Sequence, residues 1–124
     1  MRARITATIL LALTLAPASA IAEGDAQKGR GIAIQHCSRC HVVPDHNPMG
    51  GIGSTPSFRL LAELEDGMER FETFFARRPH PSFVRVQDAE SPTDLPNALQ
   101  PLELTLAELA DLIAYARRLR DWQE

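Results

Sequence analysis

The chain has 124 residues, of which 13 are basic and 16 acidic, and its net charge is −3 at neutral pH. This length suits a single domain, and the mildly acidic composition excludes the strongly basic face with which proteins bind nucleic acid. A folded part of about 100 residues has little surface to bury, so a large apolar cofactor would help to complete its core.

The N-terminal segment has the layout of a secretory signal peptide. Two arginines precede the apolar run ITATILLALTLA (residues 5–16), and small residues follow it. The run is shorter than the roughly 20 apolar residues that span a bilayer, although an uncleaved anchor is the alternative. We predict a signal peptide over residues 1–22, with cleavage after Ala20 or Ala22, and one domain over residues 23–124.

The first predicted helix covers residues 26–37 and begins after Asp25, a good N-cap residue. It contains Gly29 and Gly31, each of which costs about 1 kcal/mol relative to alanine inside a helix. A helix that keeps such glycines usually has another backbone close to it. Residues 42–57 are rich in Pro, Gly, Asn and Ser, and are predicted as a loop.

Two further helical segments are predicted in the middle of the chain. Residues 58–64 give one or two turns, and residues 68–78 place apolar side chains on one face until Pro79 ends the helix. Residues 80–101 are proline-rich and aperiodic, which predicts a long loop. The run FVRV (residues 83–86) alternates apolar and polar residues, but it is short for a strand.

The last predicted helix is the most clearly marked. Thr105 and Glu108 form a capping box at its start. Its apolar face is formed by Leu109, Leu112, Ile113, Ala116 and Leu119. Arginines occupy its final turns, where positive charge suits the helix dipole. Since no convincing strand is present, we predict an all-α fold.

The motif CSRCH places Cys37 and Cys40 three residues apart and His41 directly after them. A disulfide between the two cysteines would close a very short loop and constrain the unfolded chain little. A redox dithiol usually opens a helix in a fold with β-strands, whereas these cysteines end a helix. Two thiols that can add to haem vinyl groups, followed by an imidazole for the iron, are typical of c-type haem attachment.

Two segments resemble the class I, single-haem c-type cytochromes. GDAQKGRGIAIQHCSRCH (residues 24–41) is similar to the first helix and haem-attachment motif of that family, and DLIAYARRL (residues 111–119) is similar to its last helix. Gly29 matches the glycine where the first and last helices cross, and Leu112 and Tyr115 match the residues that pack over it. The resemblance implies a small cytochrome c-like fold and a covalently attached haem c containing iron.

The resemblance also implies roles for individual residues. Cys37 and Cys40 would attach the haem, and His41 would bind its iron. GSTPSF (residues 53–58) resembles the loop whose proline carbonyl accepts a hydrogen bond from the histidine ring. Pro56 would have that role, and such a bond fixes the tautomer of the ligand and raises its basicity.

The iron ligand opposite His41 is left open by the sequence. A methionine usually binds there in the family, but one alignment places Phe83 at the matching position, and another, made from the last helix, places Leu95 there. Met49 lies in the loop just after His41, and Met68 begins a helix, where core packing is the better explanation. His80 enters from the matching region of the chain, and an open or water-ligated iron is the alternative to it.

The implied function is that of a periplasmic electron carrier rather than an enzyme. Its partners would be redox proteins: a dehydrogenase that donates electrons, and an oxidase or membrane complex that accepts them. We expect a monomer that is not inserted in the membrane after signal cleavage. An open iron position would instead favour the binding of a small gas or reaction with peroxide. The sequence does not identify the redox partner or the role of residues 84–101.

Overall fold

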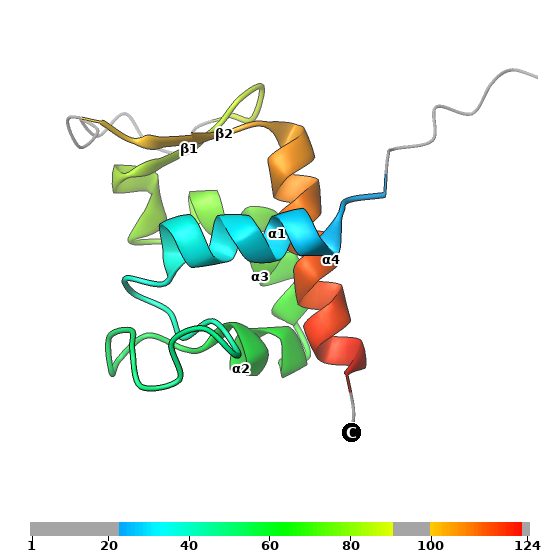
Figure 1. Ribbon diagram of the computed structural model, residues 1–124. Coiled ribbons are helices and arrows are strands. Elements are labelled where there is room, and N and C mark those ends of the chain that lie inside the picture. The colour runs from blue at the N-terminus through cyan, green and yellow to red at the C-terminus, as the bar shows by residue number, and fades with distance from the viewer. Residues whose placement is uncertain (1–22, 91–99, 123–124) are drawn as a thin grey trace, which may run out of the picture.

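A computed structural model describes residues 23–90 and 100–122. The predicted signal peptide and part of the predicted long loop lie outside these residues. The elements in chain order are α1 (Ala26–Ile32), η1 (Ala33–Cys37), α2 (Phe58–Glu63), α3 (Gly67–Thr73), η2 (Phe74–Ala76), η3 (His80–Ser82), β1 (Val84–Val86), β2 (Leu102–Leu104) and α4 (Leu106–Asp121). Figure 1 shows α1 lying across α4, with the two strands at one end of the molecule and α2 at the other.

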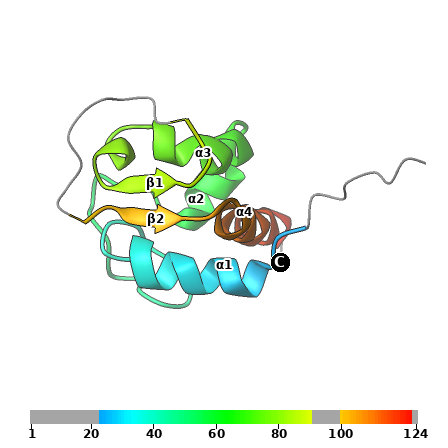
Figure 2. The ribbon, with the colours of Figure 1, turned by 90° about the horizontal axis from the view of Figure 1, so that it is seen from above.

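The prediction of an all-α fold is wrong, because β1 and β2 form a two-stranded parallel sheet. Val84 pairs with Leu102 and Val86 pairs with Leu104, and the strands lie side by side in Figure 2. The main-chain N–H of Leu102 also donates to the carbonyl of Phe83 at 2.8 Å. Strands this short depend on their partner and on the core beneath them, which no local sequence pattern specifies.

Both helix caps predicted from the sequence are confirmed. The Asp25 carboxylate accepts hydrogen bonds from the backbone N–H groups of Gln27 at 2.8 Å and Lys28 at 3.1 Å. At the start of α4, the Thr105 hydroxyl accepts from the N–H of Glu108 at 3.1 Å, and the Glu108 carboxylate accepts from the N–H of Thr105 at 2.8 Å. These local bonds fix where the two crossing helices begin.

The first and third predicted helices end as regular α-helices earlier than the sequence indicated. The first changes after Ile32 from α-helix to the π-helical turn η1, which ends at Cys37. The third ends as an α-helix at Thr73 and continues as the 3₁₀ turn η2, which ends at Ala76. A tighter or wider last turn is common at helix ends, where few backbone groups keep regular partners.

The predicted crossing of the first and last helices at Gly29 is confirmed. Gly29 is buried, and a Cβ atom there would overlap the backbone carbonyl of Asp111 and lie 2.9 Å from the nitrogen of Leu112. Nothing lies within 4 Å of the corresponding position at Gly31. The contact differs in one respect from the expectation, because the nearest atoms belong to the backbone of α4 and not to the side chain of Tyr115.

A second close contact of the two segments precedes α1. A Cβ atom at Gly24 would overlap the backbone carbonyl of Ala110, so this position also requires glycine. The N–H of Asp25 donates to the carboxylate of Asp111 at 2.6 Å. Together these contacts fasten the start of α1 to the middle of α4.

One core joins the helices to the sheet. Its buried apolar residues are Ala33, Val43, Phe58, Ala62, Phe71, Val84, Val86, Leu104, Leu109, Leu112, Tyr115, Ala116 and Leu119. Cys37, Met68 and Phe74 are partly buried against this core. The core therefore fixes both the segment that carries the cysteines and the segment that follows His80.

Candidate functional site

The cysteine motif forms a tight turn after η1. The backbone N–H groups of Cys40 and His41 both donate to the carbonyl of Cys37, at 3.1 and 2.9 Å. Both cysteines are partly buried and neither forms a disulfide. This turn keeps the two thiols and the imidazole in one short, fixed segment.

The environment of Cys37 does not suit a redox dithiol. Burial, together with the neighbouring Cys40, raises the pKa of the Cys37 thiol to about 11. Cysteines that exchange disulfides have thiol pKa values lowered well below the ordinary 8.5. At neutral pH the Cys37 thiol is therefore protonated, unlike the attacking thiol of a redox dithiol.

His41 is oriented by the loop that follows it. Its Nδ1 lies 2.7 Å from the carbonyl oxygen of Pro56, which is the hydrogen bond that the sequence predicted. Because a carbonyl can only accept, Nδ1 carries the proton and Nε2 has the free lone pair. The edge of the His41 ring also meets Phe58, with ring centroids 5.6 Å apart and planes at 88°.

Asn47 is a positioning residue that the sequence analysis missed. Its side-chain amide donates to the carbonyls of Ser38 at 2.9 Å and His41 at 3.1 Å, and its side-chain oxygen accepts from the N–H of Val43 at 2.7 Å. Asparagine commonly closes loops in this way, but its partners could not be identified from composition alone. The loop is thereby tied to both ends of the cysteine motif.

His80 lies in η3, partly buried between aromatic rings. The rings of Phe74 and Phe83 are inclined to it by 89° and 61°, with centroids 5.3 and 5.8 Å from that of its ring. Its Nδ1 lies 3.0 Å from the carbonyl oxygen of Arg77, which can only accept, so this bond orients the ring. Burial lowers the pKa of His80 from 6.5, which keeps the ring in the neutral form that binds metals.

The structure brings His41 and His80 together. Their ring centroids are 6.1 Å apart and their planes differ by only 8°. Metal–imidazole bonds are about 2.0–2.1 Å long and a ring centre lies roughly 1.1 Å behind its nitrogen, so two imidazoles on opposite sides of one metal have centroids about 6.3 Å apart. The separation of the two rings is therefore close to that of two imidazoles bound to one metal, and both cysteines lie within four residues of His41, a spacing that suits the attachment of a haem.

The other candidate ligands are placed elsewhere. Met49 is 97 % exposed in the loop after His41, and Met68 packs against the core. His36 and His46 are exposed. Phe83, which stands where a methionine was expected, is 40 % exposed and contacts the His80 ring.

Comparison of the chain with protein-family models, curated proteins and solved structures found no match. Within residues 23–90 and 100–122, no helix has the length and apolar character needed to cross a membrane. The same residues contain no group of three or more His, Cys, Asp or Glu side chains arranged around a metal. A haem iron takes only its axial ligands from the protein, so the histidine pair is the arrangement relevant to it.

Proposed function

We propose that this protein is a periplasmic c-type cytochrome that carries single electrons between redox partners. Cys37 and Cys40 would attach the haem, and His41 and His80 would bind the iron from its two sides. The observation that carries the proposal is the pair of parallel imidazoles with centroids 6.1 Å apart. One of the two, His41, follows Cys37 by four residues and Cys40 by one residue in the sequence. The partners would be a dehydrogenase and an oxidase or membrane complex.

When bound, the haem supplies a reversible one-electron change of its iron. The protein would supply two imidazole ligands whose orientation is fixed by backbone carbonyls, that of Pro56 for His41 and that of Arg77 for His80. Such hydrogen bonds raise the basicity of an imidazole. Because methionine ligation raises the reduction potential, we expect a potential below that of carriers with a histidine and a methionine.

The position of His80 favours electron transfer over gas binding or peroxide chemistry. Either alternative needs an open iron position, and His80 would fill it. Peroxide chemistry also needs acid–base groups beside the iron, while His36 and His46 are exposed and take no part in the histidine pair. Phe74 and Phe83 pack against the ring of His80 and would shield it from water.

The attachment of haem is tested by changing both cysteines to alanine. The wild-type protein, produced together with a haem-attachment system, should keep its haem through denaturing electrophoresis, and the double variant should lose it completely. Arg39→Ala is the matched control, because Arg39 is exposed between the cysteines and its loss should leave the haem attached. A colourless wild-type protein with two titratable thiols would contradict the proposal.

The role of His80 is tested by His80→Ala. The ferric wild type should be low-spin, and the variant should change spin state and, once reduced, bind carbon monoxide faster. Met49→Leu and Met68→Leu are controls that should leave the spectrum unchanged. A wild type that is already high-spin and binds carbon monoxide readily, or a methionine–iron charge-transfer band lost in one control, would exclude His80 as the ligand.

A further inference from the structure

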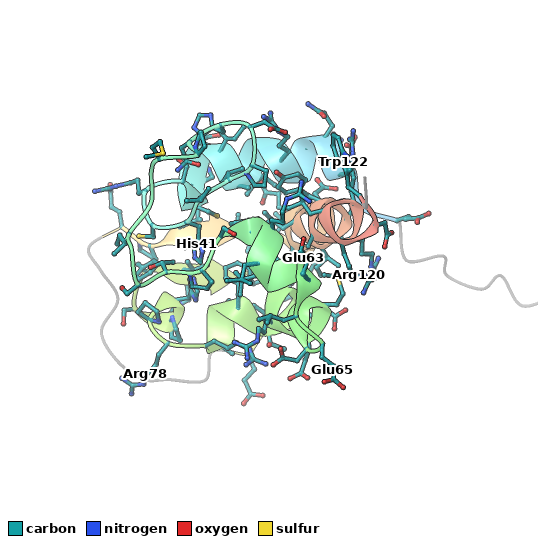
Figure 3. The ribbon with its side chains drawn as sticks, turned by 90° about the horizontal axis from the view of Figure 1, so that it is seen from below. His41, Glu63, Glu65, Arg78, Arg120 and Trp122 are labelled. Carbon is teal, nitrogen blue, oxygen red and sulfur yellow. The ribbon has the colours of Figure 1, made fainter. Side chains whose placement is uncertain are left out.

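A cavity of about 290 Å³ lies between α1, α2 and α4, and none of its lining residues belongs to the cysteine motif or to the histidine pair. Trp122, at the end of α4, is one of its walls. In Figure 3, Trp122 lies at the C-terminal end of α4, and His41 lies on the other side of α2. The cavity is thus separate from the proposed haem site.

The lining of this cavity is strongly positive for an acidic protein. Arg30, Arg59 and Arg118 come from three different helices, and Asp45 is the one carboxylate among the lining residues. Among the described residues, neither Arg30 nor Arg118 forms an ion pair with a carboxylate. These like charges repel one another, and the single carboxylate of Asp45 can balance only one of the three.

The third arginine is only weakly neutralised. Arg59 lies 3.9 Å from the carboxylate of Glu63, and the two side chains are 42 % and 52 % exposed. Exposed pairs of this kind contribute little, because water and salt screen them. The guanidinium of Arg59 therefore keeps most of its capacity to bind another anion.

Two aromatic side chains add neutral hydrogen-bond donors to the cavity. Tyr115 is 4 % exposed. Burial and the nearby carboxylate of Asp45 raise its pKa, and the positive charges of Arg30 and Arg59 act in the opposite direction. Its hydroxyl therefore stays protonated at neutral pH. The indole N–H of Trp122 can only donate. Donors thus outnumber acceptors around the cavity.

We propose that this cavity binds a compact, multiply charged oxyanion through Arg30, Arg59 and Arg118. Guanidinium groups bind phosphate and carboxylate oxygens with paired hydrogen bonds. At roughly 30 Å³ per water molecule, the space corresponds to about ten waters, enough for inorganic phosphate or a small polycarboxylate. The arrangement does not depend on haem, so it can be tested whether or not the proposed function holds.

The experiment is calorimetric titration of the full mature protein with inorganic phosphate and, separately, with citrate, at constant ionic strength. Arg118→Gln should weaken binding by about tenfold or more, the loss expected for one hydrogen bond to a charged group. Arg117→Gln is the matched control, because it removes the same charge from the neighbouring exposed position of α4, which does not line the cavity. Circular dichroism would show that both variants are folded.

Each outcome decides the proposal. Tighter binding of phosphate, or of citrate, identifies the class of oxyanion that the cavity prefers, and both results support the site. Titration heats that match those of chloride would overturn it. Equal weakening by Arg117→Gln and Arg118→Gln would also overturn it, because the effect would then reflect net charge and not this cavity.

Discussion

The two histidines of the proposed haem site are held in different ways. His41 is fixed by residues close to it in the chain: its N–H donates to Cys37, its carbonyl accepts from Asn47, and its ring donates to Pro56, the most distant of the three at 15 residues. The segment after His80 is instead fixed by β2, which begins at Leu102. The His41 side is thus a local structure, and the His80 side depends on a partner far along the chain.

This difference explains which element the sequence revealed. The residues that surround His41 form a compact motif with recognisable turn and cap signals. The sheet beside His80 depends on the pairing of two three-residue segments, and its formation carries the entropy of closing a long loop. The predictions below test whether the two sides are as independent as their contacts suggest.

The largest effect on stability is expected at the helix crossing, which supports the His41 side. Gly29→Ala places a Cβ against the backbone of Asp111, so the helices must separate, at a cost of about 3 kcal/mol or more in the free energy of unfolding. Gly31→Ala adds a Cβ where there is space and should stabilise the helix by about 0.5–1 kcal/mol. Denaturant unfolding of both variants measures the contrast.

Gly29→Ala should lower the free energy of unfolding and Gly31→Ala should raise it, so the comparison is specific to the helix crossing. If both substitutions stabilised the protein equally, α1 and α4 would not pack as closely as the structure has them. In the haem-loaded, folded Gly29→Ala variant, the absorption bands that are sensitive to the iron ligands should change little. The proposed ligands, His41 and His80, are held by contacts other than the helix crossing.

A somewhat smaller loss of stability is expected on the His80 side. Leu104 is 2 % exposed and pairs with Val86 in the sheet, so Leu104→Ala should reduce the free energy of unfolding by about 2–3 kcal/mol through lost burial and the cavity left behind. Because β1 follows η3 directly, this variant should also bind carbon monoxide faster in its reduced, haem-loaded form.

Glu103→Ala is the control for the sheet, because Glu103 is exposed on the same strand. It should change stability by less than about 0.5 kcal/mol and leave the rate of carbon monoxide binding unchanged. If Leu104→Ala lowered stability without any change in that rate, the sheet would support the core but not the position of His80.

The sequence was informative wherever the physical cause of a structure was local. Asp25 and the Thr105–Glu108 pair predicted where two helices begin, and Gly29 predicted a close backbone contact. A helix cap or an unfavourable glycine can be recognised from a short stretch of chain. The hydrogen bond from His41 to Pro56 was also predicted, from the resemblance of its loop to a known one.

The sequence was less informative where partners are distant. The sheet was missed because the alternation around Val84 has meaning only beside Leu102. His80 could be proposed as a ligand from its place in the chain, but its parallel alignment with His41 results from the packing of Phe74 and Phe83 around it. Such packing depends on the whole fold and leaves no short pattern.

The smallest predicted effect concerns the capping box where β2 passes into α4, the junction of the distant sheet with the crossing helix. Hydrogen bonds from the backbone N–H and the hydroxyl of Thr105 lower the pKa of Glu108 below 4.5 in the folded protein. A group whose folded pKa is lowered contributes stability above its unfolded pKa and loses it as the pH falls through the folded value. Glu108→Gln should therefore cost about 0.5 kcal/mol at pH 7, a small value because the carboxylate is near solvent, and this cost should disappear as the pH falls through the folded pKa of Glu108. Unfolding of the wild type and of Glu108→Gln between pH 3 and pH 7 measures this difference, with the exposed Glu103→Gln as control. A difference independent of pH would mean that the charge of Glu108 does not contribute, and that the junction is held by the apolar contacts of Leu104 and Leu109 alone.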